Sequence, residues 1–88
     1  MKSPKTKLLY TGKFEARCPV NNRRDCYDFK IRTGKTIQVE LLLEYFAQKK
    51  EERIFQEDLA VEISERFKCD VTLAGWHTGV KIVSEVTR

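Results

Sequence analysis

Several protein classes are disfavoured by what this sequence of 88 residues contains little of. It has one histidine, one tryptophan and three cysteines, and the cysteines follow neither a disulfide framework nor a Cys-x-x-Cys spacing. Disulfide scaffolds and zinc sites depend on such spacings, so we expect neither a metal site nor an oxidising compartment. No apolar run is long enough to cross a bilayer, and the first seven residues lack the apolar stretch of a secretory signal. The chain is therefore expected to be cytoplasmic, without a membrane partner.

The composition nevertheless supports a packed core. Hydrophobic residues make up 41% of the chain, with five Phe and three Tyr, and no repeat, low-complexity segment or linker interrupts it. A chain of this length forms one domain with a small core. We expect a single domain over residues 1–88, in which residues 1–6 form a flexible basic N-terminus.

Positive charge gathers in the N-terminal part of the chain. The formal net charge is +4, and residues 1–35 hold ten Lys and Arg against three Asp and Glu. This distribution suits a phosphate-rich partner. A basic tail beside a solvated hairpin explains the same charges without any partner, so both interpretations stay open.

The first third of the sequence has the pattern of two strands. Residues 7–17 predict a strand in which Gly12 marks a bulge, and residues 26–33 alternate polar and apolar side chains as a half-buried strand does. The loop from Cys18 to Asp25 joins the two strands, and residues 33–35 predict a turn.

The pattern then changes to the period of helices and back. A first helix is predicted by the apolar stripe Val39, Leu42, Leu43 and Phe46, and a second, after a charged connector over residues 49–53, by Phe55, Leu59, Ile63 and Phe67. Residues 70–75 and 80–86 return to strand composition, with a turn at His77-Thr78-Gly79.

The resulting order, strand–strand–helix–helix–strand–strand, predicts an α+β fold. Its elements form an antiparallel sheet with both helices on one face. Four strands are too few to close a barrel and leave two exposed edges, whereas a ring of subunits joined edge to edge would cover the edges and enlarge the core. We therefore expect a homo-oligomer, and a monomer with edges blunted by basic termini is the alternative.

The loop Cys18-Pro19-Val20-Asn21-Asn22-Arg23-Arg24-Asp25 places a thiol and a carboxylate seven positions apart. Pro19 stiffens the turn, and the neighbouring arginines favour a charged sulfur. A thiolate can attack an electrophilic carbon when an acid nearby supplies the proton that the reaction consumes. The alternative is a surface hairpin loop that happens to hold a half-buried cysteine.

Three features together resemble the QueF family of tunnelling-fold enzymes. They are Cys-Pro followed by Asp25 at the seven-residue interval, Val39-Glu40 at the start of the first helix, and Phe55-Gln56-Glu57-Asp58 at the start of the second. The resemblance covers most of the chain from Lys7 onward and implies a fold in which such units assemble into barrels. It also implies an assembly of five or ten subunits.

The chain differs from the reductase members of the family in two features, and these differences favour a resemblance to another branch. The reductase members carry Glu-x-Lys-x-x-Lys for the phosphates of NADPH, and this chain has Leu42 and Tyr45 in place of the lysines. It also has Gln56 where the reductases have histidine. Without its cations a phosphate site has little reason to hold a dinucleotide. The chain therefore resembles the compact QueF-like branch, the archaeosine synthases, which are amidinotransferases without a redox cofactor.

The activity implied by this branch is the conversion of 7-cyano-7-deazaguanine in tRNA to archaeosine with ammonia. Cys18 is then the nucleophile that forms a thioimide with the nitrile, and Asp25 the general acid and base. Glu57 and, on weaker grounds, Glu40 would recognise the base, although an acidic residue in the first turn of a helix is common without a function. The candidates for phosphate contacts are the N-terminal lysines together with Lys13, Arg17, Arg23 and Arg24. Two other functions stay open: an NADPH-dependent nitrile reductase of the free base, and a non-catalytic RNA-binding module.

The remaining rare residues carry weaker signals. Trp76 and His77 are expected to lie at the hairpin turn, where a packed aromatic is favoured over a platform for base stacking or a contact with a base edge. Cys26 and Cys69 are expected to be small core residues.

Overall fold

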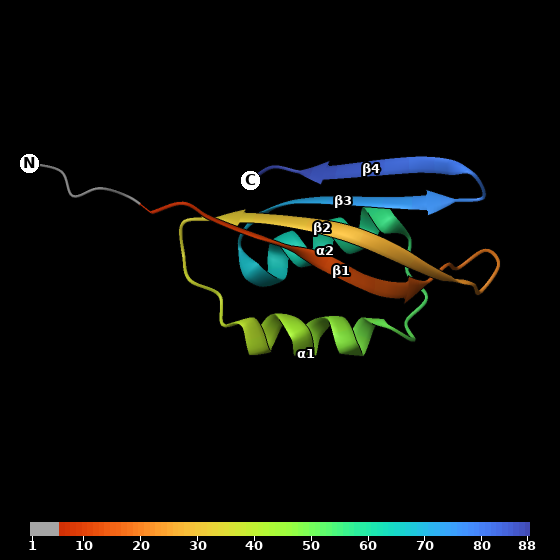
Figure 1. Ribbon diagram of the computed structural model, residues 1–88, viewed down its shortest axis with the longest axis horizontal. Helices are drawn as coiled ribbons and strands as arrows, with labels where there is room; N and C mark the ends of the chain where they lie inside the picture. The colour runs from red at the N-terminus through yellow and green to blue at the C-terminus, as the bar shows by residue number, and fades with distance from the viewer. Residues whose placement is uncertain (1–5) are drawn as a thin grey trace, which may run out of the picture.

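The computed structural model describes residues 6–88, so the predicted N-terminal segment lies outside the described residues except for Thr6. Its elements follow the chain in the order β1 (Leu8–Arg17), β2 (Arg24–Thr33), α1 (Val39–Lys49), α2 (Gln56–Phe67), β3 (Asp70–His77) and β4 (Val80–Val86). The four strands form one sheet in the order β1-β2-β3-β4, and all neighbours are antiparallel. The predicted α+β class and element order are confirmed (Figure 1).

Both helices pack on the same face of the sheet. In β2 the side chains of Tyr27, Phe29 and Ile31 are buried, and the residues between them are exposed. This alternation sorts the strand into a helix-facing side and a free side. The helix α1 lies against β1, and α2 lies against β3 and β4. Phe46 of α1 stacks on Phe14 of β1 with ring centroids 4.3 Å apart.

The buried stripe of α1 differs from the one predicted. Leu42 and Phe46 are buried as expected, but Val39 is 53% exposed and Leu43 63% exposed. Tyr45 is buried instead, because its ring packs edge-on against Phe67 of α2 at 5.3 Å. The contact with the second helix thus rotates the buried face of α1 toward Tyr45.

The segment between the helices also departs from a simple charged connector. Lys49 ends α1 and is buried, with its ammonium 2.9 Å from Glu52 and in contact with Glu62 of α2. Burial opposes the charged form of Lys49, but the two carboxylates outweigh it and raise its pKa. Phe55, predicted in the stripe of the second helix, precedes α2 and is 47% exposed. Neither helix of the described part has the length and apolarity needed to span a membrane.

Two glycines of the sheet make room for aromatic rings. The register between β1 and β2 is continuous, so the bulge predicted at Gly12 does not occur. Instead, a Cβ atom at Gly12 would lie 2.9 Å from the ring of Phe29, its cross-strand partner. A Cβ atom at Gly75 would lie 2.6 Å from the ring of Tyr27, which is also its cross-strand partner. Glycine is required at both positions by close packing and not by a break in pairing.

Both hairpin turns lie at the same end of the sheet (Figure 1). In the first, Asn22 adopts a positive φ of 60°; in the second, Thr78 and Gly79 adopt 51° and 85°, as a two-residue primed turn requires. His77 therefore belongs to β3 and not to the turn, and Asp25 belongs to β2 and not to the loop. Side chains alternate along a strand, so residues two positions apart share a face. Asp25 is two positions from Tyr27 and His77 two positions from Gly75, so both lie on the helix-facing side.

We predict that Gly75→Ala destabilises the protein by roughly 1–3 kcal/mol, because the new methyl group overlaps the buried ring of Tyr27. Urea unfolding would measure the difference. Gly34→Ala is the matched control, since its Cβ would meet only a backbone oxygen at 3.7 Å. Equal stability of the two variants would contradict the packing argument.

Candidate functional site

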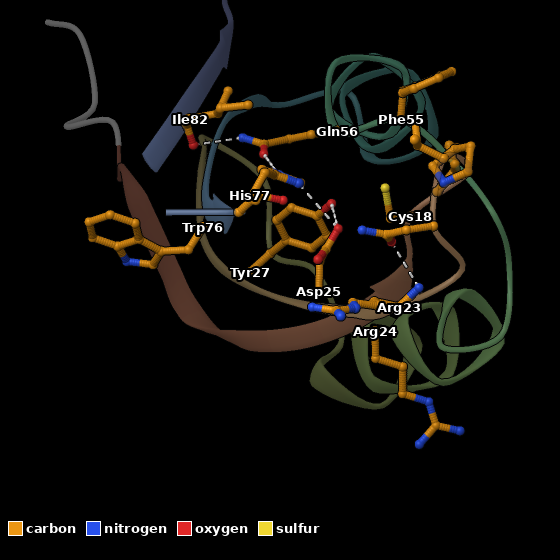
Figure 2. A pocket seen from close by; sticks show the side chains of 15 residues that line it. Cys18, Arg23, Arg24, Asp25, Tyr27, Phe55, Gln56, Trp76, His77 and Ile82 are labelled. Atoms are coloured by element: carbon orange, nitrogen blue, oxygen red, sulfur yellow. Dashed lines mark hydrogen bonds and ion pairs between the residues drawn. The ribbon is translucent and has the colours of Figure 1, made fainter. Parts of the chain in front are cut away.

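A cavity of about 490 Å³ opens at the end of the sheet where both hairpins turn and α2 begins. Cys18 and Asp25 reach it from the first hairpin, His77 from β3, and Gln56 from the start of α2 (Figure 2). Phe55, Trp76 and Ile82 supply apolar surface to its lining. A cavity of this size, with an apolar lining and a few polar groups, is typical of sites for small molecules.

Backbone pairing beyond the sheet joins the first hairpin to the start of α2. The amide of Arg17 donates to the carbonyl of Glu52 at 3.0 Å, and the amide of Ile54 donates to the carbonyl of Arg17 at 3.2 Å. The residues on either side of this pairing, Cys18 and Phe55, are thereby held against one cavity.

The loop that carries Cys18 is fixed by its own hydrogen bonds. The amide of Cys18 donates to the carbonyl of Arg23 at 2.8 Å, and its carbonyl accepts from the amide of Asn22 at 2.9 Å. The side chain of Asn21 accepts from the amide of Arg23 at 3.0 Å. Asparagines stabilise such reversals, and Asn22 tolerates the left-handed conformation that the loop requires.

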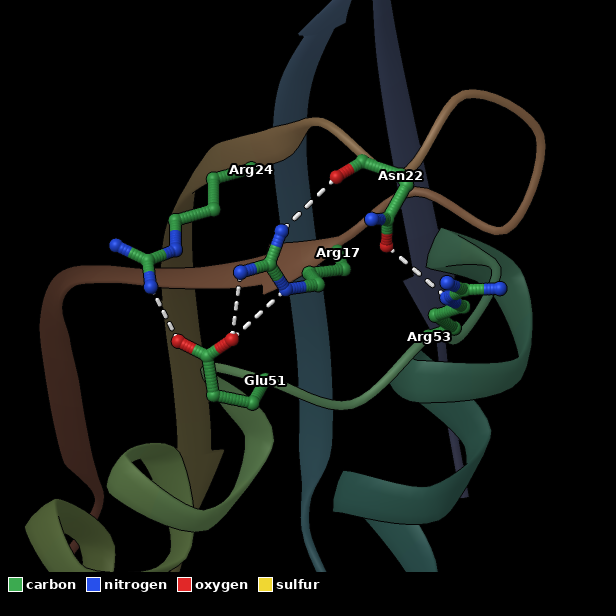
Figure 3. A network of polar contacts seen from close by, with 5 residues as sticks. All are labelled: Arg17, Asn22, Arg24, Glu51 and Arg53. Atoms are coloured by element: carbon green, nitrogen blue, oxygen red, sulfur yellow. Dashed lines mark hydrogen bonds and ion pairs between the residues drawn. The ribbon is translucent and has the colours of Figure 1, made fainter.

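Ion pairs and hydrogen bonds between side chains hold the same loop in place (Figure 3). The guanidinium of Arg17 contacts Glu51 through Nε at 2.8 Å and Nη2 at 2.7 Å, and Arg24 contacts the other oxygen of Glu51. Arg17 also donates to the carbonyl of Asn22 at 3.0 Å, and Arg53 donates to the Asn22 side chain at 3.0 Å. The hydrogen bond from Arg17 lowers the pKa of Glu51 against the opposing effect of desolvation, and the charge of Arg17 and the contact with Arg24 lower it further.

A chain of polar contacts crosses the inner wall of the cavity. His77 Nδ1 lies 3.2 Å from Oδ2 of Asp25, and His77 Nε2 lies 2.8 Å from Oε1 of Gln56. The hydroxyl of Tyr27 donates to the same oxygen of Asp25 at 3.5 Å. Burial, followed by the charges of Asp25 and Cys18, raises the pKa of Tyr27, so its phenol stays protonated and acts as a donor.

The predicted site residues fall into two groups. Cys18 and Asp25 line one cavity, as their proposed roles require, and neither is sealed from solvent. Glu57 is exposed and does not line that cavity. Glu40 is exposed at the start of α1, which lies at the opposite end of β1 from Cys18. In a single chain, therefore, neither glutamate meets the thiol.

The predicted phosphate contacts are likewise dispersed. Lys13 projects from the free face of the sheet and lies 3.6 Å from Asp28. Arg17 and Arg24 are engaged with Glu51, whereas the guanidinium of Arg23 has no side-chain partner among residues 6–88. The N-terminal candidates Lys2 and Lys5 lie outside the described residues.

Two residues of the cavity were not assigned a role from the sequence. In the sequence, Gln56 stands out only as a departure from a motif, and His77 only as a residue of the predicted turn. The sequence signal was that the single histidine of the chain follows a β-strand pattern that ends beside a hairpin. The preference for a packed aromatic was wrong for Trp76, which is 65% exposed beside the cavity.

The other two cysteines differ from each other. Cys69 is buried as predicted, and burial, followed by the charge of Asp70, raises its pKa to about 11. The prediction was wrong for Cys26, which is exposed because it alternates with Tyr27 and so faces away from the helices. Within residues 6–88, no three His, Cys, Asp or Glu side chains are grouped as metal ligands would be.

The fold matches a solved crystal structure of the archaeosine synthase QueF-Like in the apo form. The match has a TM-score of 0.86 and 21% sequence identity, and it covers 97% of this chain and 94% of that chain. At this identity the likeness establishes a common fold. No protein-family model matches the sequence. No curated protein matches it either.

We predict that a maleimide or iodoacetamide labels Cys18 and Cys26 in the folded protein at about pH 8 and leaves Cys69 unmodified. A thiol with a pKa near 11 is then roughly one part in a thousand thiolate, against about a quarter for an ordinary cysteine. Peptide mapping after the reaction identifies the modified positions, and urea should expose the third thiol. Labelling of Cys69 at the rate of Cys26 under native conditions would contradict this assignment.

Proposed function

We propose that this protein is a tRNA-modifying amidinotransferase of the archaeosine synthase type. Its substrate would be 7-cyano-7-deazaguanine within tRNA, and its co-substrate ammonia. The observation that carries the proposal is that Cys18 and Asp25 line one cavity on a fold shared with the archaeosine synthase QueF-Like.

In the first half-reaction the sulfur of Cys18 attacks the nitrile carbon. A carbon–sulfur bond forms, one π bond of the nitrile breaks, and the nitrogen receives a proton by way of Asp25. The product is a thioimide in which nothing has left, since the proton gained by nitrogen balances the one lost by the thiol. The target base has to be extruded from the folded tRNA to reach the sulfur.

In the second half-reaction ammonia adds to the thioimide carbon. Asp25 takes a proton from the added nitrogen, the carbon–sulfur bond breaks, and the thiolate of Cys18 leaves. The overall change is the addition of ammonia to a nitrile to give an amidine, without oxidation or reduction. The residues of the cavity thus need no redox cofactor for this reaction.

The environment of α1 disfavours the reductase alternative. The two positions that would carry phosphate-binding lysines are occupied by Leu42 and Tyr45, and both side chains are buried in the core. Tyr45 is further held by its hydroxyl, which donates to Glu62 at 2.7 Å. This face of α1 therefore offers neither the charge nor the exposure that the phosphates of NADPH require.

We further propose that the working form is a homo-oligomer, with five or ten subunits and a barrel closed edge to edge, as the family resemblance implies. In the described chain β1 and β4 each have a free edge. Trp76, Val80 and Ile82 expose apolar surface near the cavity. A second copy covering this surface would complete the cavity, and the exposed Glu57 would then recognise the base in such a shared site.

The mass of the intact protein tests the nucleophile. After mixing with 7-cyano-7-deazaguanine, the wild-type protein is expected to gain the full mass of the base, because the addition releases no fragment. Cys18→Ala should gain nothing. Cys26→Ala is the control, since it removes another exposed thiol and should still form the adduct.

The outcomes separate the three candidate functions. An adduct without NADPH oxidation, followed by ammonia-dependent amidine formation in tRNA, supports the amidinotransferase. NADPH oxidation in the presence of the free base would identify a reductase. An unchanged mass for wild-type protein with both the free base and the modified tRNA would leave only a binding module.

Binding to tRNA is expected to weaken steeply with salt. If Lys13, Arg17, Arg23 and Arg24 each contact a phosphate, a fourfold rise in salt lowers the affinity about a hundredfold. Arg23→Ala should reduce the slope of log K against log salt by about one, whereas Lys35→Ala, at an exposed turn at the other end of the sheet, should not. Filter binding at several salt concentrations measures both slopes, and a flat dependence would exclude tRNA as the partner.

A further inference from the structure

The orientation of the Gln56 amide is fixed by two backbone carbonyls. Its Nε2 donates to the carbonyl of Leu73 in β3 at 3.0 Å and to that of Ile82 in β4 at 2.9 Å. The side chain is 3% exposed, so water does not compete for these bonds. An inverted amide would place oxygen against both carbonyl oxygens. The end that faces His77 is therefore the oxygen, Oε1.

This orientation decides which ring nitrogen of His77 carries a proton. Oε1 has no hydrogen to donate, so Nε2 of His77 must supply the hydrogen of the 2.8 Å contact. A neutral imidazole has only one N–H group, and its Nδ1 is then a bare acceptor. That acceptor faces Oδ2 of Asp25 at 3.2 Å, and a carboxylate oxygen is an acceptor as well.

At this distance the lone pairs of two acceptors repel each other, and a hydrogen between them would turn the contact into an attraction. Tyr27 donates to the same oxygen of Asp25, but its hydroxyl lies beside the Asp25–His77 contact and supplies no hydrogen to Nδ1. Such a hydrogen would be an additional proton, carried either by the carboxyl of Asp25 or by Nδ1 of His77. In both forms the pair of side chains has no net charge.

Resting on the proposed function, the geometry points to Gln56 and His77 as positioning residues, and to one proton that Asp25 and His77 share and hold in reserve for the nitrile nitrogen. Gln56 acts by accepting a hydrogen from Nε2 of His77, which disfavours the neutral tautomer that carries its hydrogen on Nδ1. If Nε2 were free to give up its hydrogen, a neutral His77 would donate from Nδ1 to the Asp25 carboxylate, and no extra proton would be needed.

The same constraint explains how one carboxyl serves two half-reactions. When Asp25 gives the reserve proton to the nitrile nitrogen as the Cys18 thiolate attacks, a carboxylate is left facing the bare Nδ1 of His77. The ring cannot relieve this contact by changing tautomer, because Gln56 holds its Nε2 hydrogen. The pair therefore regains a proton readily, and the ammonia nitrogen that adds to the thioimide carries one to give. Thiolate departure then balances the charge.

Other groups that face or lie near the pair from neighbouring elements influence where this proton resides. The hydroxyl of Tyr27 stabilises the carboxylate form, and its raised pKa keeps it a donor throughout. The remaining titratable or charged groups on or beside the cavity are Cys18, Arg23, Arg24 and Glu57.

Nitrogen NMR of the free protein tests the proton's position directly. His77 is the only histidine, so its two ring nitrogens give unambiguous signals in a long-range ¹H–¹⁵N correlation of labelled protein at neutral pH. We expect a protonated Nε2 together with an Nδ1 that carries or shares a proton. A bare Nε2 with an ordinary Nδ1–H would overturn the inference.

Two variants separate the contributions of the partners. Gln56→Met removes the acceptor, so the ring should shift to the neutral tautomer with hydrogen on Nδ1. Asp25→Asn is the second variant in case Gln56→Met does not fold, and it replaces the carboxylate with an amide donor. Its ring should keep Nε2–H and lose the proton from Nδ1; a protonated Nδ1 would count against a shared proton.

Adduct kinetics then distinguish this inference from the proposed function. His77→Asn retains a hydrogen-bond donor to Asp25 but cannot titrate, and it should slow formation of the Cys18 adduct by about 10²–10⁴-fold at neutral pH. Adduct formation at the wild-type rate would overturn the role of His77 and leave the thioimide intact. The expected NMR signals without any adduct would instead remove the proposed function and leave the proton placement standing.

Discussion

The site depends on a short stretch of backbone pairing outside the sheet. Arg17 exchanges hydrogen bonds with Glu52 and Ile54, residues more than thirty positions later in the chain. This contact fastens the end of β1 to the segment that enters α2, so the loop bearing Cys18 and the helix start bearing Gln56 share one cavity. The ion pairs of Glu51 with Arg17 and Arg24 reinforce this backbone contact. Without the attachment the thiol and the amide would belong to separate surfaces.

Features set by local periodicity could be predicted from the sequence. Both the two-residue alternation in β2 and the four-residue interval in α2 arise because a single face of each element is buried. The structure buries all the residues that define these patterns: Tyr27, Phe29, Ile31, Leu59 and Ile63. The buried face of α1 could not be predicted as well. Two of its apolar positions are exposed because a contact with α2, and not the helix's own pattern, decides how it is rotated. The spacing of apolar residues predicts the buried face of a helix only when the rest of the protein covers all of that face.

The candidate site divides in the same way. The thiol and the carboxyl lie on one hairpin, so their seven-residue spacing was enough to predict that they line the same part of the surface. The contact between Gln56 and His77 joins residues 21 positions apart, and it depends on where α2 begins relative to the end of β3. Spacing in the sequence contains no information on that offset. The glutamine at position 56 becomes intelligible only with the structure, because two carbonyls and an imidazole together require two donor hydrogens and an acceptor from one side chain.

The two glycines of the sheet have a consequence for how this protein diverges. At each of them a small residue on one strand faces a large ring on the next, so volume is conserved across the pair and not within either strand. A larger residue at either glycine therefore favours a smaller side chain at its cross-strand partner. Such paired constraints act on few positions and leave most surface residues free to change. The matched crystal structure has the same fold at 21% sequence identity, which is consistent with this view. Covariation between these cross-strand partners would be the trace that this packing leaves in related sequences.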